Sequence, residues 1–210
     1  MVKKPTGKRT LWHIKKEGAR VESSIIRLEF PDSKNEIEKL IVTIFCKAVV
    51  HEKCFKILSM PAKISDHDID FRMNTSLGEM GVELVEDAPL TKEGYENLKS
   101  QYTSEERYEY LKGLIQSKSN KYKNYDKTKT KSLIIYNTDG KLGTIDSITA
   151  LIIKYCHMHK MVFDYIFYLN PRPDFTAALV LFYPQGKEVV AAVLSCNEAE
   201  LLKDGYVHLL

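Results

Sequence analysis

The sequence contains few cysteines and no pattern that would pair them, since its four cysteines lie far apart and form no CxxC motif. Neither a zinc site nor a disulfide framework is therefore expected, and buried free thiols are the simpler interpretation. Long hydrophobic runs are also missing, because no apolar stretch approaches the roughly 18 residues that cross a bilayer. The basic start leads into no apolar export segment, which favours a cytoplasmic location and no membrane partner.

An excess of charge of one sign is lacking as well, because the formal net charge is only +3 in 210 residues. The charges are nevertheless distributed unevenly. Residues 3–20 carry seven basic side chains against one glutamate, residues 112–131 carry seven lysines against one aspartate, and residues 65–109 are acidic. Basic flanks around an acidic centre could hold a polyanion at a metal site. Lysine runs are also typical of solvated loops and faces, so both interpretations stay open.

The chain length suits one well-buried core. We expect residues 1–24 to be a basic N-terminal arm and residues 25–210 to be a single domain. Hydrophobic periodicity predicts strands at 25–30, 69–73, 81–86, 132–137, 162–169, 177–183 and 189–194, and helices at 33–58, 103–122 and 144–158. Strands that alternate with helices predict an α/β fold with a mixed sheet covered by helices.

The most informative segment is the acidic hairpin expected between residues 69 and 86. If Met73 pairs with Met80, the antiparallel register places Asp70 opposite Glu83, with Cβ atoms about 5 Å apart. Two carboxylates so placed repel each other unless a proton or a cation lies between them. A divalent cation such as Mg²⁺, which binds carboxylates, water and phosphate oxygens, would remove the conflict. The alternative is that both side chains lie on a solvated sheet face and pair with Arg72 or other cations.

Asp70 and Glu83, on a hairpin that follows a long helix, resemble the metal-binding pair of the PD-(D/E)XK nuclease superfamily. The segments that follow, 115–122, 133–137 and 163–169, also match the helix, strand, helix and strand succession of that superfamily. The resemblance covers roughly residues 33–185. It implies a restriction-endonuclease-like core in the order helix, β-hairpin, helix, strand, helix, strand. It also implies Mg²⁺ or Mn²⁺ as cofactor and cleavage of phosphodiester bonds in DNA or RNA.

Two positions depart from the family pattern. Ile69 stands where the family has proline, and Val85 stands where it has the lysine that orients water and steadies the phosphate. In some members a lysine from the neighbouring helix substitutes, and here Lys118 is the best candidate, with Lys121 next. The resemblance thus implies Asp70, Glu83 and Lys118 as the catalytic residues.

Family domains often add a glutamate from the first helix to the metal ligands Asp70 and Glu83. Glu36 or Glu38 could serve, and Glu36 is our candidate, although its spacing from Ser33 also predicts a capping box. The basic segment that follows the second helix would contact the phosphates of a nucleic acid. Its candidate residues are Lys121, Lys123, Lys129 and Lys131.

The missing lysine after Glu83 leaves a second hypothesis, a catalytically inactive nuclease-like fold that binds nucleic acid or another protein. A third is a dimer that buries apolar strand edges near the C-terminus. The orientation of Lys118 distinguishes the first two. An ammonium within one water of both carboxylates favours the enzyme, and a lysine turned to solvent favours the binding module.

Overall fold

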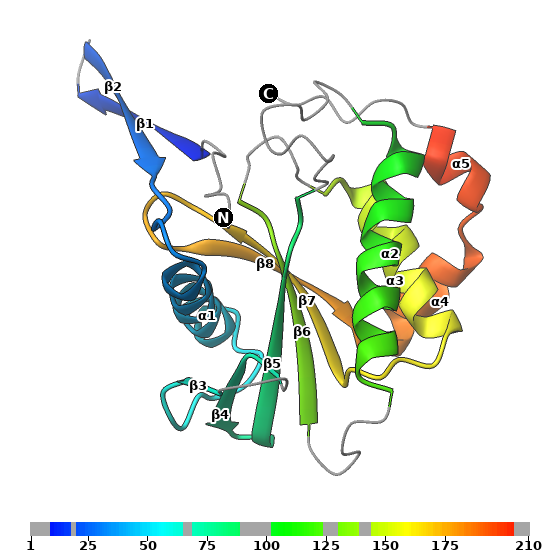
Figure 1. Cartoon of the computed structure of the whole chain (residues 1–210). Helices are drawn as coiled ribbons and strands as arrows, with labels where there is room; N and C mark the ends of the chain where they lie inside the picture. The colour runs from blue at the N-terminus through cyan, green and yellow to red at the C-terminus, as the bar shows by residue number, and fades with distance from the viewer. Residues whose placement is uncertain are drawn as a thin grey trace.

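Six strands form one open mixed sheet at the centre of the protein, in the order β3-β4-β5-β6-β7-β8 (Figure 1). This computed structural model describes residues 9–17, 20–64, 69–88, 102–123, 130–138 and 144–203. The strands are β3 (Ala62–Lys63), β4 (Phe71–Thr75), β5 (Gly78–Glu86), β6 (Thr130–Tyr136), β7 (Tyr165–Pro171) and β8 (Ala177–Tyr183). The three central strands β5, β6 and β7 are parallel, and the flanking strands pair antiparallel. The predicted α/β class and mixed sheet are therefore confirmed.

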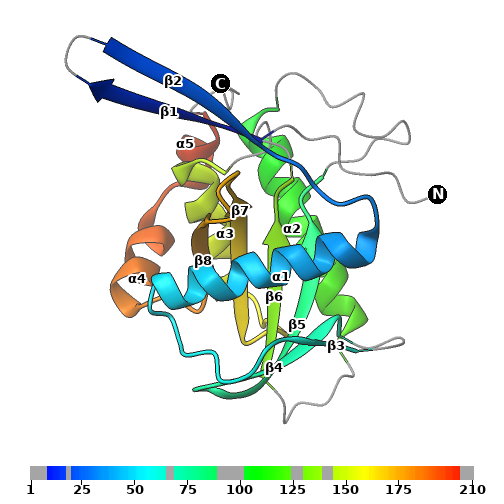
Figure 2. The same ribbon diagram turned by 90° about the vertical axis from the view of Figure 1, so that its left-hand side faces the viewer.

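Helices cover both faces of the sheet. Helix α1 (Lys34–His51) lies across one face, as Figure 2 shows. Helices α2 (Ser104–Lys121) and α3 (Asp146–Met158) cover the other face, with α4 (Lys187–Ser195) and α5 (Glu198–Lys203) beside them (Figure 1). Each face has its own hydrophobic cluster, one built around α1 and one around α2 and α3. The sheet therefore separates two cores.

The alternation of side chains along β6 explains this division. Ile134 and Tyr136 belong to the cluster under α1, whereas Leu133 and Ile135 belong to the cluster under α2 and α3. Successive side chains of a strand point to opposite faces, so a strand covered on both sides needs an unbroken apolar run. The run Leu-Ile-Ile-Tyr meets that need and fixes β6 in the middle of the sheet.

Both long helices begin at the capping residues that the sequence predicts. At the start of α2, Thr103 Oγ1 accepts a hydrogen bond from the backbone N–H of Glu106 at 3.1 Å. The carboxylate of Glu106 accepts one from the backbone N–H of Thr103 at 3.0 Å, which completes the capping box. Ser33 caps α1 in the same way through the backbone N–H of Glu36. These side chains satisfy N–H groups that the first turn of a helix leaves without partners.

The predicted extent of the first helix was wrong at its C-terminal end. The helix ends at His51 rather than near Leu58, and Lys53 takes a positive φ of 56° just beyond it. A residue in this left-handed region cannot continue a right-handed helix. The chain then runs beside β4, where Ile57 forms an isolated bridge with Thr75. The apolar residues after His51 therefore line an extended segment.

Two further segments differ from the sequence-based expectation. Residues 189–194, expected as a strand, belong to helix α4, whose Val193 packs into the cluster around α2 and α3. A short apolar run does not by itself distinguish a buried strand from a buried helix. In the expected basic arm, β1 (Arg9–Glu17) and β2 (Arg20–Leu28) pair as an antiparallel hairpin. Strand β2 crosses the boundary that we expected after residue 24.

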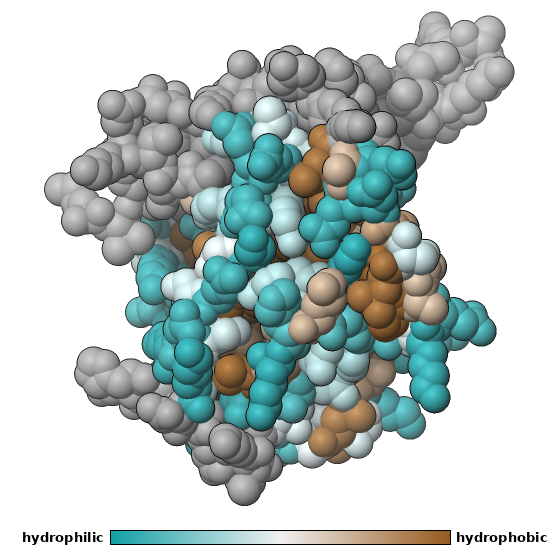
Figure 3. All heavy atoms as spheres, turned by 90° about the vertical axis from the view of Figure 1, so that its right-hand side faces the viewer, coloured by the Kyte–Doolittle hydropathy of each residue, from teal (hydrophilic) through white to brown (hydrophobic). Residues whose placement is uncertain are grey.

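The outer face of the α2–α5 layer is mostly hydrophilic, with scattered apolar patches (Figure 3). The exposed apolar residues of this layer include Met158, Val189 and Leu194. Among the described residues, no helix combines the length and the apolar character that crossing a membrane requires.

Candidate active site

The β4–β5 hairpin positions the two carboxylates on which the nuclease resemblance rests. Met73 lies opposite Met80, which is the register that the sequence predicts. Continued by three residues, that register brings Asp70 opposite Glu83. Asp70 lies immediately before β4, and its Oδ2 accepts a hydrogen bond from the backbone N–H of Leu84 at 2.8 Å. The aspartate is thereby tied to the strand that carries the glutamate.

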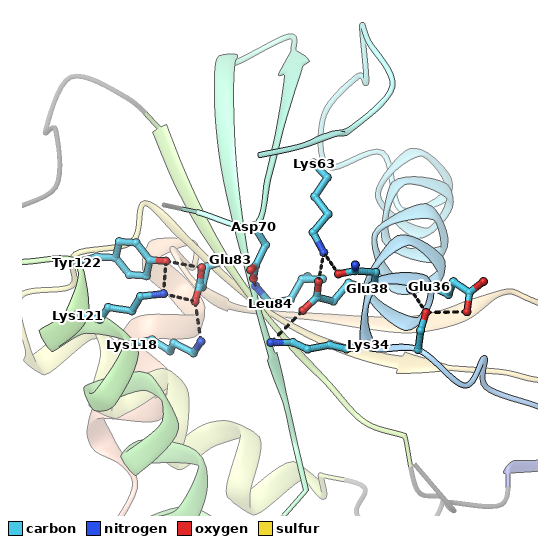
Figure 4. Close-up of polar contacts among 12 residues, drawn as sticks. Lys34, Glu36, Glu38, Lys63, Asp70, Glu83, Leu84, Lys118, Lys121 and Tyr122 are labelled. Carbon is cyan, nitrogen blue, oxygen red and sulfur yellow. Dashed lines mark hydrogen bonds and ion pairs between the residues drawn. The ribbon is translucent and has the colours of Figure 1, made fainter. Parts of the chain in front are cut away.

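Glu83 is a buried carboxylate, only 1% exposed, and α2 supplies three polar partners for it. Lys118 Nζ lies 2.6 Å from Glu83 Oε1, and Lys121 Nζ lies 3.4 Å from the same oxygen. Tyr122, at the C-terminal end of α2, donates its hydroxyl hydrogen to Glu83 Oε2 at 2.5 Å. Figure 4 shows these side chains converging on the carboxylate. Charge-assisted hydrogen bonds of this kind are what make a buried carboxylate tolerable.

A third carboxylate comes from the opposite face of the sheet. Glu38 of α1 is only 4% exposed, and its oxygens lie 2.7 Å from Lys63 Nζ and 3.5 Å from Lys34 Nζ. Figure 4 shows Asp70 between Glu38 on one side and Glu83 on the other. Glu38, Asp70 and Glu83 therefore form a row of three carboxylates, which we call the carboxylate row.

The electrostatics of Asp70 reflect its place in this row. Its pKa is raised above the ordinary value, mainly because burial disfavours the charged form. The hydrogen bond from Leu84 acts against this rise, and the negative charges of Glu83 and Glu38 add to it. The positive charge of Lys118 lowers the pKa of Asp70, so this ammonium acts on both Asp70 and Glu83. A cation near Asp70 would relieve the repulsion within the row.

The structure does not bring Glu36 into the row. Its carboxylate accepts a hydrogen bond from Ser33 Oγ at 2.7 Å at the start of α1. Figure 4 shows Glu36 on the far side of the helix from Asp70. Glu36 therefore acts as the capping residue, and Glu38 is the glutamate that the first helix directs toward the row. Two residues along a helix correspond to a rotation of about 200°, so only one of this pair can face the sheet.

The lysines expected to contact nucleic acid have different environments. Lys121 contacts Glu83, and Lys123 is exposed just after α2. Lys129 lies outside the described residues. Lys131 is only 4% exposed, and its backbone N–H donates to Asp164 Oδ2 at 2.7 Å. Its position in the buried strand β6 removes it from the set of surface phosphate contacts.

The carboxylate row has the chemistry of a hard-cation site, although its oxygens already have partners. Among the described residues, no group of three or more His, Cys, Asp or Glu side chains has the geometry to hold a metal ion. A cation that took two oxygens from the row would compete with Lys118 at Glu83 and with Lys63 at Glu38. The donor set of carboxylate oxygens fits Mg²⁺ or Mn²⁺ better than zinc.

Tyr122 is a site residue that the sequence analysis did not single out. The ring is buried and packs edge-on against Phe163 at 5.8 Å between centroids, while its hydroxyl reaches Glu83. A signal was present in the sequence. Tyr122 follows Lys118 by four residues, and residues so spaced share one face of a helix.

A second buried polar cluster fixes the start of α2 against the sheet. Arg107 is 1% exposed and forms a bidentate ion pair with Asp87, with N–O distances of 3.0 and 2.6 Å. Tyr168 of β7 donates its hydroxyl hydrogen to the same aspartate at 2.6 Å. Because α2 carries the cations that bind Glu83, this pair helps to set where those cations lie.

No protein-family model, no curated sequence and no solved structure matches the chain.

Proposed function

We propose that this protein is a divalent-metal-dependent phosphodiesterase that cleaves DNA or RNA, with a site of PD-(D/E)XK type. The order of elements α1, hairpin, α2, β6, α3 and β7 supports the proposal, because it follows the succession that the resemblance implies. Asp70 and Glu83 would be the metal ligands, and Lys118 would be the catalytic lysine. Glu38 would join the ligands only if the three carboxylates moved closer together, since the described residues contain no ready group of three metal-binding side chains.

The single observation that carries the proposal is the contact between Lys118 and Glu83. Val85 replaces the lysine that the family pattern places two residues after the glutamate, and valine can neither donate a hydrogen bond nor carry charge. Lys118 brings an ammonium to 2.6 Å from Glu83 from a different element. Its charge also reaches Asp70. The ammonium thus lies within direct reach of one of the two carboxylates, which supports a catalytic role for Lys118.

The residues of the site would divide the work of hydrolysis. A bound divalent cation would neutralise charge on the phosphate and lower the pKa of a water molecule. Asp70 and Glu83 would hold that cation. Lys118 would donate a hydrogen bond to the attacking water or to a phosphate oxygen, where negative charge develops in the transition state. Tyr122 would keep its hydrogen bond to Glu83 Oε2 and so hold this carboxylate in position.

The test is cleavage of labelled single-stranded and double-stranded DNA and RNA in the presence of Mg²⁺ or Mn²⁺. An Asp70→Ala/Glu83→Ala protein and a Lys118→Ala protein should be assayed beside the wild type. Lys112→Ala is the matched control, because Lys112 lies on the same helix and pairs with Glu109 at 2.7 Å, outside the site. We expect metal-dependent cleavage by the wild type and by the control, none by the Asp70→Ala/Glu83→Ala protein, and cleavage slowed by about 100-fold or more in the Lys118→Ala protein.

A second candidate function is supported by the charge balance of the row. Glu38 and Glu83 are each paired with lysine ammonium groups, so these two carboxylates are compensated without a metal ion. A nuclease-like fold that binds nucleic acid without cutting it needs no metal ion, so carboxylates paired with lysines are compatible with that function. Absence of cleavage on every substrate, together with metal-independent binding of nucleic acid, would favour this second function over the first.

A further inference from the structure

A hollow of about 320 Å³ lies where the C-terminal end of α2 meets the segment that joins α3 to β7. Its volume falls at the lower end of the roughly 300–1,000 Å³ that is typical of small-molecule pockets. Residues of two helices and of the joining segment line it, and they do not include any member of the carboxylate row. We call it the α2–α3 pocket.

The polar groups of one wall are suited to the edge of a nucleobase. Gln116 and Asn120 both line the pocket and are exposed. They lie four residues apart on α2, so their side chains project from one face of the helix. A carboxamide offers a donor and an acceptor together, which is the pattern that base edges present. Ser119, between them, has a buried hydroxyl without a hydrogen-bond partner among the described residues. This wall therefore offers several groups that a polar ligand could bond.

The opposite wall offers a flat surface. The rings of Tyr155 and His159 lie 4.4 Å apart between centroids at an interplanar angle of 31°. His159 Nδ1 lies 2.8 Å from the carbonyl oxygen of Tyr155, which can only accept, so Nδ1 carries a hydrogen and the ring orientation is fixed. Because His159 is exposed, its outer face is accessible to a second ring. Aromatic rings held in this way are the usual stacking surface for an unpaired base.

The charge of the pocket fits a phosphate. Lys123 and Lys160 line it, and none of its lining residues is acidic. Two ammonium groups beside a stacking surface and two carboxamides match the phosphate and the base of one nucleotide.

The pocket is joined to the carboxylate row through the last turn of α2. Tyr122 contacts Glu83 through its hydroxyl and packs its ring on Phe163, the residue after Val162 of the pocket wall. A nucleic-acid strand laid across this turn would therefore pass from Lys121, which contacts Glu83, to Lys123, which lines the pocket.

We infer that the α2–α3 pocket binds one unpaired nucleotide of a single-stranded nucleic acid, next to the phosphodiester that the carboxylate row acts on. This inference rests on the proposed function and gives it a substrate class. A base inside a duplex is stacked and paired, so it could enter a pocket of this size only after leaving the stack. The protein should therefore prefer single strands or strands with an unpaired base.

The test measures binding by the full-length protein in the presence of a chelator, so that no cleavage takes place. Three labelled oligomers of equal length are titrated by fluorescence anisotropy: a single strand, a duplex, and a single strand whose sites are abasic. The variants are His159→Ala and Gln116→Ala/Asn120→Ala, all at exposed positions whose loss should leave the fold intact. Lys112→Ala on the same helix serves as the control.

We expect each pocket variant to weaken binding of the base-bearing single strand by about fivefold or more, since stacking of a base on an aromatic ring is worth at least that much. Binding of the abasic strand and of the duplex should stay within twofold of the wild type, a margin of about 0.4 kcal/mol. Equal losses on the base-bearing and abasic strands, or no loss on either, would overturn the inference. Because binding is measured without metal, a protein that binds in this way but fails to cleave would refute the catalytic proposal and leave the nucleotide pocket in place.

Discussion

Lys118 Nζ lies 2.6 Å from Glu83 Oε1, although the two residues are 35 positions apart in the sequence and belong to different elements. The contact links the hairpin that carries the carboxylates to the helix that covers them. It also supplies, from α2, the positive charge that Val85 cannot supply from β5.

The first prediction concerns this contact. Lys118→Ala should lower the rate of metal-dependent cleavage by about 100-fold or more, because removing a donor that acts on developing charge typically costs that much. Lys118→Arg should recover only part of the rate, since a planar guanidinium does not occupy the place of a compact ammonium. Steady-state cleavage assays measure both, with Lys112→Ala expected to match the wild type. Full activity of Lys118→Ala would exclude this lysine from catalysis.

The second prediction concerns pH. Burial raises the pKa of Asp70 above 3.8, so the folded protein holds this proton more tightly than the unfolded chain. The resulting stabilisation is complete below the ordinary pKa and is lost as the pH rises through the raised value. Asp70→Asn removes this dependence while its amide oxygen can still accept from Leu84. As the pH rises above the ordinary pKa of Asp70, the free energy of unfolding of the variant should therefore increase relative to that of the wild type.

Asp174 provides a control of opposite sign for this experiment. Its pKa is lowered, chiefly by the hydrogen bond from the hydroxyl of Thr176, so its contribution is present above the ordinary pKa and lost as the pH falls. Asp174→Asn should lose stability relative to the wild type as the pH rises. Urea unfolding curves at a series of pH values distinguish the two. Parallel pH profiles for both variants would contradict the assignment of a raised pKa to Asp70.

The third prediction concerns the buried pair of Arg107 and Asp87. Arg107→Leu leaves a carboxylate buried without its ion-pair partner, and breaking such a pair typically costs about 3–5 kcal/mol of unfolding free energy. Glu109→Ala breaks the exposed pair with Lys112 and should cost about 1 kcal/mol or less. Chemical denaturation measures both values. A cost for Arg107→Leu as small as that of the control would mean that the buried pair does not hold α2 in place.

The fourth prediction concerns a close approach inside the hairpin. A Cβ added at Gly81 would lie 2.6 Å from Ile69 Cδ1, so Gly81→Ala must displace that side chain. Overpacking of this kind costs about 1–3 kcal/mol. Because Ile69 precedes Asp70, the displacement should also lower the cleavage rate. Ile69→Val removes the clashing atom, so the double variant should be more stable than the sum of the two single effects predicts. A double-mutant cycle in urea measures this coupling; strict additivity would argue against the clash.

Much of the fold was predictable because the local patterns and the tertiary structure agree. The capping pairs Ser33–Glu36 and Thr103–Glu106 predicted where the two long helices begin, and the structure has the pairing of Met73 with Met80 that we assumed for the hairpin. The continuous apolar run of β6 predicted a strand buried on both faces. In each case, residues close together in the sequence are sufficient to identify the helix or strand.

Other features could not be predicted from the sequence, because they depend on how segments far apart in the chain pack together. Glu36 and Glu38 are both plausible ligands by composition, and only the orientation of α1 on the sheet decides that Glu38 faces Asp70. Lys131 stands in a lysine-rich segment, but its place in β6 buries it. The apolar residues 189–194 form a helix that buries only Val193 against the cluster around α2 and α3, so the short apolar run did not identify the element.

The row formed by Glu38, Asp70 and Glu83 has a consequence for refolding. Its members are held by α1 on one face of the sheet and by α2 on the other, and the two faces have separate hydrophobic clusters. Neither cluster alone brings the three carboxylates and Lys118 together. During renaturation, the proposed cleavage activity should therefore return only when the slower of the two cores has formed. Recovery of activity then reports that last step, even when the helical signal has already reached its final value.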